Sequence, residues 1–252
     1  MKKDKKKVVF LSSIILLFLC VIGVGIFLLT KSKEPEKVSQ PDLDPIEIEE
    51  PALEEQEEVY ESPIDFAHWK SVNDDVYAWI RIADTNIDYP ILQHETDDSY
   101  YLEHTIDGVE GYPGSIYTEK VNAKDFSDFN TLIYGHDMRD GSMFKHLHKF
   151  EDYEFFETHD TVLIYTETET KSYRVYAAVI YDNRHIMYTY DNDNMEDRTA
   201  FIQSLKEIGG KGSYFREGMT IDENSKLITM STCITGQPDK RYIVVAEEIV
   251  DS

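Results

Sequence analysis

Hydrophobic residues follow two patterns along this chain. The first is one uncharged run at residues 8–30, VVFLSSIILLFLCVIGVGIFLLT. At about 1.5 Å per residue, a helix of that length crosses a bilayer core of about 30 Å. The second pattern, from about residue 63 onward, is a series of short apolar runs separated by polar turns. Many strands with few helices favour a mainly β domain, a barrel or a sandwich with helices added to it.

Residues 8–30 are predicted to be a transmembrane helix. A cleaved signal peptide is the alternative, but its apolar region should be shorter and should end in small residues at a cleavage site, which this run lacks. Cys20 follows Leu19, so a lipoprotein-type processing site also fits poorly. Lysines are denser in the tail at residues 1–7 than after the run, which places the N-terminus in the cytoplasm and the remainder outside the cell membrane.

Residues 31–62 are rich in Glu, Asp and Pro and poor in large apolar residues. Such a composition predicts an extended, self-repelling linker. The folded extracellular domain is expected over residues 63–252.

Periodicity within this domain predicts its elements. Helices are expected over 65–82, 142–156 and 194–208, the last capped by Asn194. Strands are expected at 86–93, 115–117, 130–136, 162–165 and 173–181, followed by two strands within 226–246.

The acidic net charge of the chain excludes some classes of binding partner. The net charge is −24, and the first 33 residues carry seven lysines against one aspartate, so the remainder carries −30. A surface this acidic disfavours nucleic acid and anionic lipid headgroups. The two cysteines, Cys20 and Cys233, cannot form a disulfide framework.

The stretch 226–246, KLITMSTCITGQPDKRYIVVA, holds the candidate chemistry. Cys233 ends the first predicted strand and Arg241 opens the second, so a hairpin would bring the thiol and the guanidinium close together. Neither residue decides the matter alone, because a lone cysteine often acts as a small buried hydrophobe and a lone arginine often forms a surface ion pair.

A reactive cysteine needs a base, and His136 is the best candidate among eight histidines because it ends the apolar strand NTLIYGH behind a glycine. Most of the others are expected to be ordinary surface residues. His146 and His148 are two positions apart, so they would point away from each other on a helix and make a poor metal pair.

The segments NTLIYGHDMRDGSMF, LITMSTC and RYIVVA, behind a single predicted span, closely resemble the sortases of Gram-positive bacteria. The resemblance covers roughly residues 62–250 and is greatest for class B. One departure is ITMSTC, which keeps Thr232 and Cys233 of the TLxTC-like family motif but differs before them. The resemblance implies a closed β-barrel of about eight strands, with N-terminal helices and a long helix before the cysteine strand.

The same resemblance implies an activity, transpeptidation. Cys233 would be the nucleophile, His136 the general acid and base, and Arg241 the donor to the substrate carbonyl or oxyanion. The implied partners are the sorting-signal peptide of a surface protein or pilin and an amine acceptor, a peptidoglycan precursor or a pilin lysine. No metal or organic cofactor and no nucleic acid is expected.

Other readings fit the residues less well. L,D-transpeptidases carry their histidine and cysteine in one short SHGC-like segment, which is absent, and papain-like proteases have the opposite order of cysteine and histidine. A membrane-anchored binding module that has kept a sortase-like fold without activity is the alternative from a different functional class.

Overall fold

The computed structural model describes residues 60–208 and 212–250. These residues belong to the second of the two units into which the chain divides, Glu57–Ser252. The predicted basic tail, membrane span and nearly all of the linker lie outside the described residues. Within 60–208 and 212–250, no helix is long and apolar enough to cross a bilayer.

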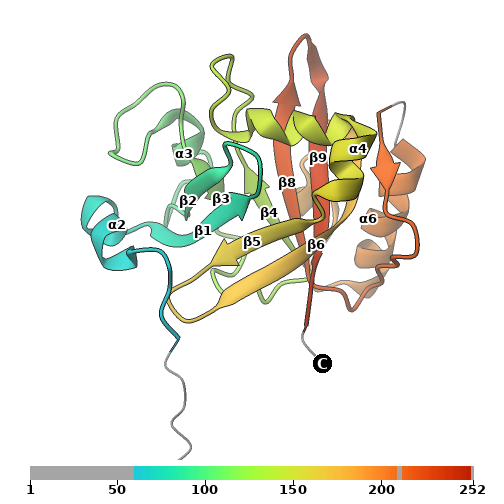
Figure 1. Ribbon diagram of the computed structural model, residues 1–252, viewed down its shortest axis with the longest axis horizontal. Coiled ribbons are helices and arrows are strands. Elements are labelled where there is room, and N and C mark those ends of the chain that lie inside the picture. The colour runs from blue at the N-terminus through green and yellow to red at the C-terminus, as the bar shows by residue number, and fades with distance from the viewer. Residues whose placement is uncertain (1–59, 209–211, 251–252) are drawn as a thin grey trace, which may run out of the picture. The chain divides into compact units, whose positions relative to one another are not determined.

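The described part of the chain forms a closed β-barrel (Figure 1). Its strands follow the order β5-β1-β2-β3-β4-β8-β9-β6, and pairing of β5 with β6 closes the ring of eight, while a short β7 adds to β6. The strands are β1 Val76–Ile82, β2 Asp88–Leu92, β3 Ile116–Thr118, β4 Asn130–Tyr134, β5 Thr161–Tyr165, β6 Thr170–Asp182, β7 Tyr214–Phe215, β8 Leu227–Ile234 and β9 Gln237–Glu248. The predicted eight-stranded barrel is confirmed.

Helices lie between and around these strands. They are α2 Phe66–Val72, α3 Tyr100–Glu103, the 3₁₀ helix η1 Phe144–Glu151, α4 Tyr153–Thr158, α5 Ile186–Thr189 and α6 Met195–Ile208. The predicted long helix before the cysteine strand is α6. Asn194 caps it as expected, because its side-chain oxygen accepts from the backbone N–H of Glu196 at 2.8 Å and of Asp197 at 3.2 Å.

Two sequence predictions were wrong in detail. Helix over 65–82 holds only for α2, because β1 (Val76–Ile82) is a strand buried on both faces, and its near-continuous apolar run imitates a helix. The helix expected over 142–156 divides into η1 and α4. Asp152 separates them, with extended backbone and a side chain that caps α4 through Phe155 N–H at 3.0 Å.

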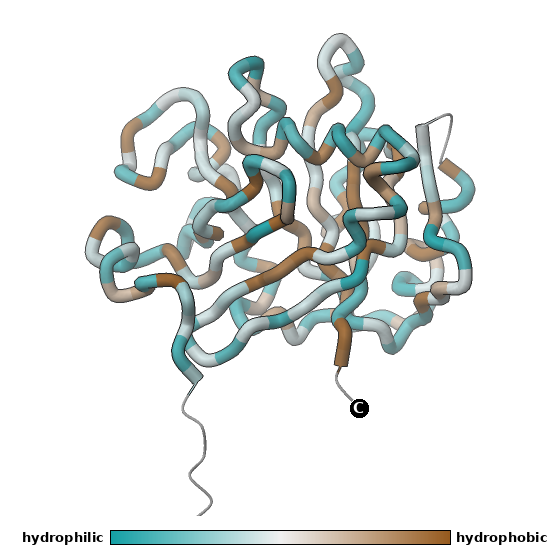
Figure 2. The backbone as a smooth tube through the Cα atoms, viewed as in Figure 1, coloured by the Kyte–Doolittle hydropathy of each residue, from teal (hydrophilic) through white to brown (hydrophobic). Residues whose placement is uncertain are grey.

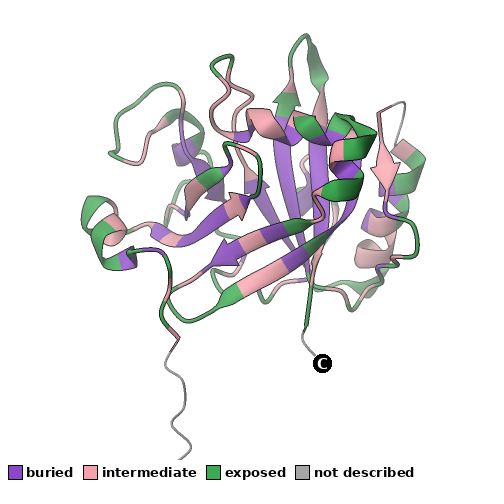
Figure 3. Ribbon diagram, viewed as in Figure 1, coloured by how far each residue is buried: buried purple, intermediate pink, exposed green. Residues whose placement is uncertain are grey.

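Two apolar layers pack on opposite faces of the sheet. The barrel interior holds Ile228 and Met230 of β8, whereas Leu227 belongs to an outer cluster covered by Phe201 and Leu205 of α6. Figures 2 and 3 show hydrophobic, buried residues along the central strands and hydrophilic, exposed residues in the surrounding loops. Because strand side chains alternate, Cys233 shares the outer face with Leu227.

The pairing of β4 with β8 positions the candidate residues. These two strands run parallel, with Tyr134 opposite Ser231. His136 and Cys233 each lie two residues further along. Both therefore leave the sheet at the same end of the barrel.

Candidate active site

Cys233 and Arg241 are direct cross-strand neighbours. Register between β8 and β9 places them opposite each other, just before an irregularity at Ile234. Side chains on paired strand positions have Cβ atoms about 4.5–5.5 Å apart. The thiol is free and Cys233 is exposed. The hairpin predicted from the sequence is confirmed, with Gly236 in the turn at φ +80°.

Gly135 holds the strand exit of β4 close to β8. Its N–H donates to the Ser231 carbonyl at 3.2 Å, and its own carbonyl accepts from the Thr232 hydroxyl at 2.8 Å. A Cβ at this position would lie 2.7 Å from Cγ of buried Phe144, a distance that side chains do not tolerate. Glycine before His136 is therefore required by packing.

His136 is fixed by a contact with a distant backbone group. Its Nε2 donates to the Leu102 carbonyl at 2.7 Å, and its ring lies 5.0 Å from the Tyr112 ring, centroid to centroid. Because a carbonyl oxygen only accepts, the proton on Nε2 leaves Nδ1 as the nitrogen available to take a proton from a reacting group.

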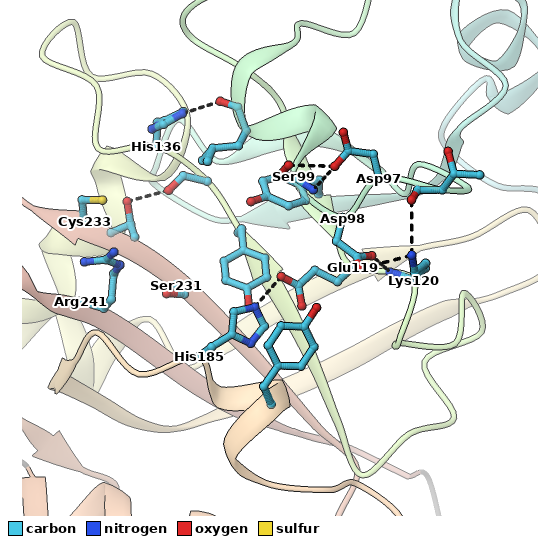
Figure 4. Close-up of a pocket in the computed structure, with 17 residues that line it drawn as sticks. Asp97, Asp98, Ser99, Glu119, Lys120, His136, His185, Ser231, Cys233 and Arg241 are labelled. Atoms are coloured by element: carbon cyan, nitrogen blue, oxygen red, sulfur yellow. Dashed lines mark hydrogen bonds and ion pairs between the residues drawn. The ribbon is translucent and has the colours of Figure 1, made fainter.

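Arg241 is held by its own turn. Its Nη1 donates to the carbonyls of Pro238 at 3.1 Å and Lys240 at 2.8 Å. The guanidinium is thereby set beside the thiol, as Figure 4 shows. A charge placed there can stabilise a developing oxyanion.

A cavity of about 820 Å³ contains all three predicted site residues in its lining. In Figure 4, His136, Cys233 and Arg241 lie on one side, Asp97, Ser99 and Lys120 on the other, and Glu119 and His185 between them. The structure thus brings the three predicted residues together beside a space large enough for a peptide.

A second histidine, which no pattern in the sequence singles out for catalysis, supports the nucleophile. His148 of η1 donates from Nε2 to the Cys233 carbonyl at 3.0 Å. Its Nδ1 faces Oε1 of Glu151 at 2.5 Å. A local sequence pattern cannot predict this contact, because the two residues lie 85 positions apart.

Asp137, next to His136, joins the loop after β4 to the loop after β8. Its Oδ2 accepts from the Thr235 hydroxyl at 2.7 Å, and its Oδ1 forms an ion pair with Lys145 Nζ at 2.8 Å. Burial alone would raise the pKa of this carboxyl, but the bonds from Lys145 and Thr235 outweigh it and hold the pKa below its usual range. The loops after β4 and β8 are therefore tied together.

Glu119 forms a second polar group in the cavity wall. It follows β3, its side chain is 9% exposed, and its Oε1 accepts from His185 Nε2 at 2.7 Å. Burial raises the pKa of Glu119, and the bond from His185 offsets only part of that rise. No local pattern in the sequence pairs these two residues, which lie 66 positions apart.

These groups fit covalent catalysis by a thiol. Over residues 60–208 and 212–250, no group of three or more His, Cys, Asp or Glu side chains is arranged to hold a metal ion. Cys233, a proton-carrying imidazole and a fixed guanidinium together provide a nucleophile, an acid–base group and an oxyanion donor.

Comparison with known proteins identifies one family, the sortases. The family model for the sortase domain matches residues 80–249. Sortase B of Listeria monocytogenes is 34% identical over 182 residues, which cover 72% of this chain and 72% of that protein.

Solved structures agree with this comparison. Sortase B of B. anthracis, in a complex with AAEK1, superposes with a TM-score of 0.66 at 28% identity, covering 77% of this chain and 89% of the other. A class B sortase of Streptococcus pyogenes involved in pilus biogenesis gives a TM-score of 0.63 at 27% identity, covering 74% and 98%.

Proposed function

This chain belongs to the sortase family, is most similar to class B, and is a cysteine transpeptidase. From that premise we propose that it cleaves a C-terminal sorting signal and joins the new carboxyl end of the remaining protein to an amine of the cell wall or of a pilin. The observation that carries the proposal is the meeting of His136, Cys233 and Arg241 in one cavity.

In the first half-reaction, the Cys233 thiolate attacks the carbonyl carbon of the scissile peptide bond. Arg241, a permanent charge with a fixed fork of donors, stabilises the resulting oxyanion. His136 gives a proton to the leaving nitrogen as the C–N bond breaks. The products are a thioester on Cys233 and the released C-terminal fragment.

In the second half-reaction, an amine attacks the thioester carbonyl. His136 takes the proton from the attacking nitrogen, the C–S bond breaks, and the Cys233 thiolate returns. Arg241 stabilises the second oxyanion in the same way. Electrons and protons balance over the cycle, so it needs no oxidant.

Membrane anchoring forms part of the proposal. The uncharged run 8–30 and the acidic linker 31–62 would hold the enzyme at the outer face of the cell membrane. A substrate retained in the same bilayer would then meet it at a raised effective concentration. The sequence pattern alone supports this arrangement.

The test is turnover of a fluorogenic library of randomised pentapeptides by the full chain, with an amine acceptor present. Two acceptors, a peptidoglycan stem peptide and a lysine-containing pilin peptide, distinguish cell-wall anchoring from pilus assembly. We expect a thioester on Cys233 and loss of turnover in Cys233→Ala, whereas Cys20→Ala serves as a matched control.

Equal turnover by the wild type and by Cys233→Ala would sink the proposal. A binding module without activity would give no turnover and no thioester, and a methanethiosulfonate reagent would then leave its peptide affinity unchanged.

A further inference from the structure

His148 lies on η1, a helix that is firmly anchored next to the nucleophile. Figure 1 shows η1 lying across β8 and β9, and it contacts both strands. Phe144, Leu147 and Phe150 of η1 are buried in the barrel core. The imidazole stacks on the buried ring of Tyr242 of β9, with the ring centroids 5.1 Å apart. Packing on both sides of the helix therefore fixes the position of the imidazole.

The carbonyl that His148 binds lies where the sheet is irregular. Register between β8 and β9 shifts between Cys233 and Ile234. Such irregularities disrupt the ladder of backbone bonds locally and are frequent beside active sites. The bond from His148 Nε2 to the Cys233 carbonyl, at 3.0 Å, therefore holds the backbone of the nucleophile at a point where the sheet holds it less.

The two nitrogens of the imidazole determine its charge. Nε2 faces the Cys233 carbonyl at 3.0 Å, and Nδ1 faces Glu151 Oε1 at 2.5 Å. A carbonyl and an ionised carboxylate only accept hydrogen bonds, so each nitrogen must carry a proton. The Glu151 side chain is 46% exposed, so water stabilises its ionised form. His148 is therefore an imidazolium in this arrangement.

The groups that face the imidazole from other elements favour that positive charge. From the loop after β4, Asp137 Oδ2 lies 3.9 Å from Nε2 of His148. Lys145 of η1 is paired with the other oxygen of Asp137 at 2.8 Å. Tyr242 stays neutral, because burial raises the pKa of its hydroxyl. Two carboxylates, of Asp137 and Glu151, thus face the imidazole against one paired lysine.

The solvent side of the imidazole does not oppose a cation either. An open hollow of about 450 Å³ borders the ring there, and its other titratable members are Lys149, Asp152, Glu154 and His159. Lys149 Nζ donates to the Asp84 carbonyl at 2.6 Å, and His159 Nε2 lies 3.1 Å from the Asp84 carboxylate. Both therefore have acceptors of their own, and the two remaining members are acidic.

The charge of His148 lies close enough to act on the thiol. Covalent geometry keeps Sγ within about 5 Å of the carbonyl oxygen of its own residue, which places the cation no more than about 8 Å from the sulfur. A positive charge at that distance favours a thiolate over a thiol. Arg241 lies opposite Cys233 on β9, so two cations approach the nucleophile from different elements.

We propose that His148 is a positioning residue of this active site: as an imidazolium held between Glu151 and the Cys233 carbonyl, it fixes the nucleophile and stabilises its thiolate form. It acts through Cys233 and not on the substrate. This inference rests on the proposed function, in which the thiolate attacks the scissile carbonyl.

The first experiment measures the charge of the imidazole directly. The full chain, labelled with ¹⁵N in its histidines and held in detergent, is studied by NMR at pH 7, and His148→Gln identifies the His148 signals. We expect both ring nitrogens to be protonated in the wild type and only Nε2 to be protonated in Glu151→Gln. Glu196→Gln makes the same carboxylate-to-amide change on the exposed first turn of α6 and should leave both protons in place.

The second experiment measures the positive charge beside the sulfur. Iodoacetate is an anion and iodoacetamide is neutral, so the ratio of their alkylation rates reports that charge. The full chain carries Cys20→Ala, so that only Cys233 reacts. His148→Gln, which can still donate to the carbonyl, should lower the ratio by about two- to threefold, and His148→Lys should keep it.

His146→Gln is the matched control for alkylation. His146 lies on the same helix, and its Nδ1 accepts from the Asn86 backbone N–H at 2.8 Å. The bond joins it to a different part of the chain from the nucleophile. This variant should keep the wild-type ratio of the two rates.

Turnover shows whether the charge serves the reaction. With the best peptide from the library, His148→Gln should lower kcat by about threefold to thirtyfold and leave KM within about twofold, the range expected between a water-like and a protein-surface dielectric. His148→Lys should recover most of that loss. Thermal melting confirms that each variant is folded.

Three results would overturn the inference. These are a neutral His148 ring in the wild type, a rate ratio unchanged in His148→Gln, and an equal loss of kcat in His148→Gln and His148→Lys. The NMR and alkylation measurements need no peptide. If the wild type turned over no peptide, the proposed function would fall, and those two measurements would still decide the charge of His148.

Discussion

The two sides of the cavity satisfy their polar atoms differently. Around Cys233, hydrogen bonds from His148 and Thr232 and to Asp137 hold the thiol loop in place. Around Glu119, burial raises the pKa of the carboxyl, and the bond from His185 offsets only part of that rise. Groups that hold reacting atoms in place are fixed by bonds within the protein, whereas a buried carboxylate costs stability unless its partners offset the burial.

The largest expected effect is on the reacting side. His136→Ala should lower kcat/KM by about 10²–10⁴-fold, because both half-reactions then lose their proton carrier. Peptide cleavage by the full chain measures it. His68→Ala, an exposed histidine on α2, is the control and should keep wild-type turnover. Comparable losses in the two variants would contradict the assignment.

Arg241→Lys should cost about tenfold to a hundredfold in kcat, with a smaller change in KM. Lysine keeps the charge but loses the fork that Nη1 anchors to Pro238 and Lys240. Steady-state kinetics separate the two constants. Arg139→Lys, at an exposed position close in sequence to His136, should change neither. A purely raised KM would instead make Arg241 a substrate-binding residue without an oxyanion role.

Asp137→Asn should lower the free energy of unfolding at pH 7 by about 1–3 kcal/mol, since Lys145 and Thr235 lose a charged partner. The folded pKa of Asp137 is lowered, so its contribution is present above the unfolded value of about 3.9 and is lost as pH falls through the folded pKa. Urea unfolding from pH 7 to pH 3 should show the deficit narrowing.

Asp107→Asn, at an exposed position, should show no deficit at any pH. A deficit for Asp137→Asn that stays constant down to pH 3 would mean that the side chain acts through packing and not through its charge.

The smallest expected effect is a gain in stability, opposite in sign to the loss expected for Asp137→Asn. Glu119→Gln should raise the free energy of unfolding by about 0.5–1 kcal/mol at pH 7, because it removes a buried charge held at a raised pKa. Such a carboxylate costs stability as pH rises from the unfolded value of about 4.3 through the folded pKa. The gain should therefore disappear below about pH 4, and Glu196→Gln should show none. Destabilisation at pH 7 would indicate that Glu119 serves the fold.

Some parts of the fold and of the site could be predicted from the sequence and others could not, and the reasons are physical. Cys233 and Arg241 lie in one hairpin, so local alternation and turn chemistry were enough to pair them. Strand β1 was missed because burial of both its faces removes the alternation that distinguishes a strand from a helix.

The contacts of His148 and His185 could not be predicted from the sequence, for a different reason. Contacts of His148 with Cys233 and of His185 with Glu119 depend on tertiary packing and join residues 85 and 66 positions apart. A pattern read over ten or twenty residues contains no information about such pairs. The strand exit and the resemblance to a family both singled out His136 as the catalytic histidine, but neither identified the groups that hold the site in place.

Strand β9 has a consequence for how the enzyme matures. It pairs with β8 on one side and with β6 on the other, so a central strand of the barrel also carries Arg241. The bond between Thr232 and Gly135 spans 97 positions, and contacts that distant in sequence form slowly. The β8–β9 hairpin pairs Cys233 with Arg241 locally, but His136 arrives only when β4 pairs with β8. A chain that has formed the hairpin alone therefore carries the thiol and the guanidinium without an acid–base group.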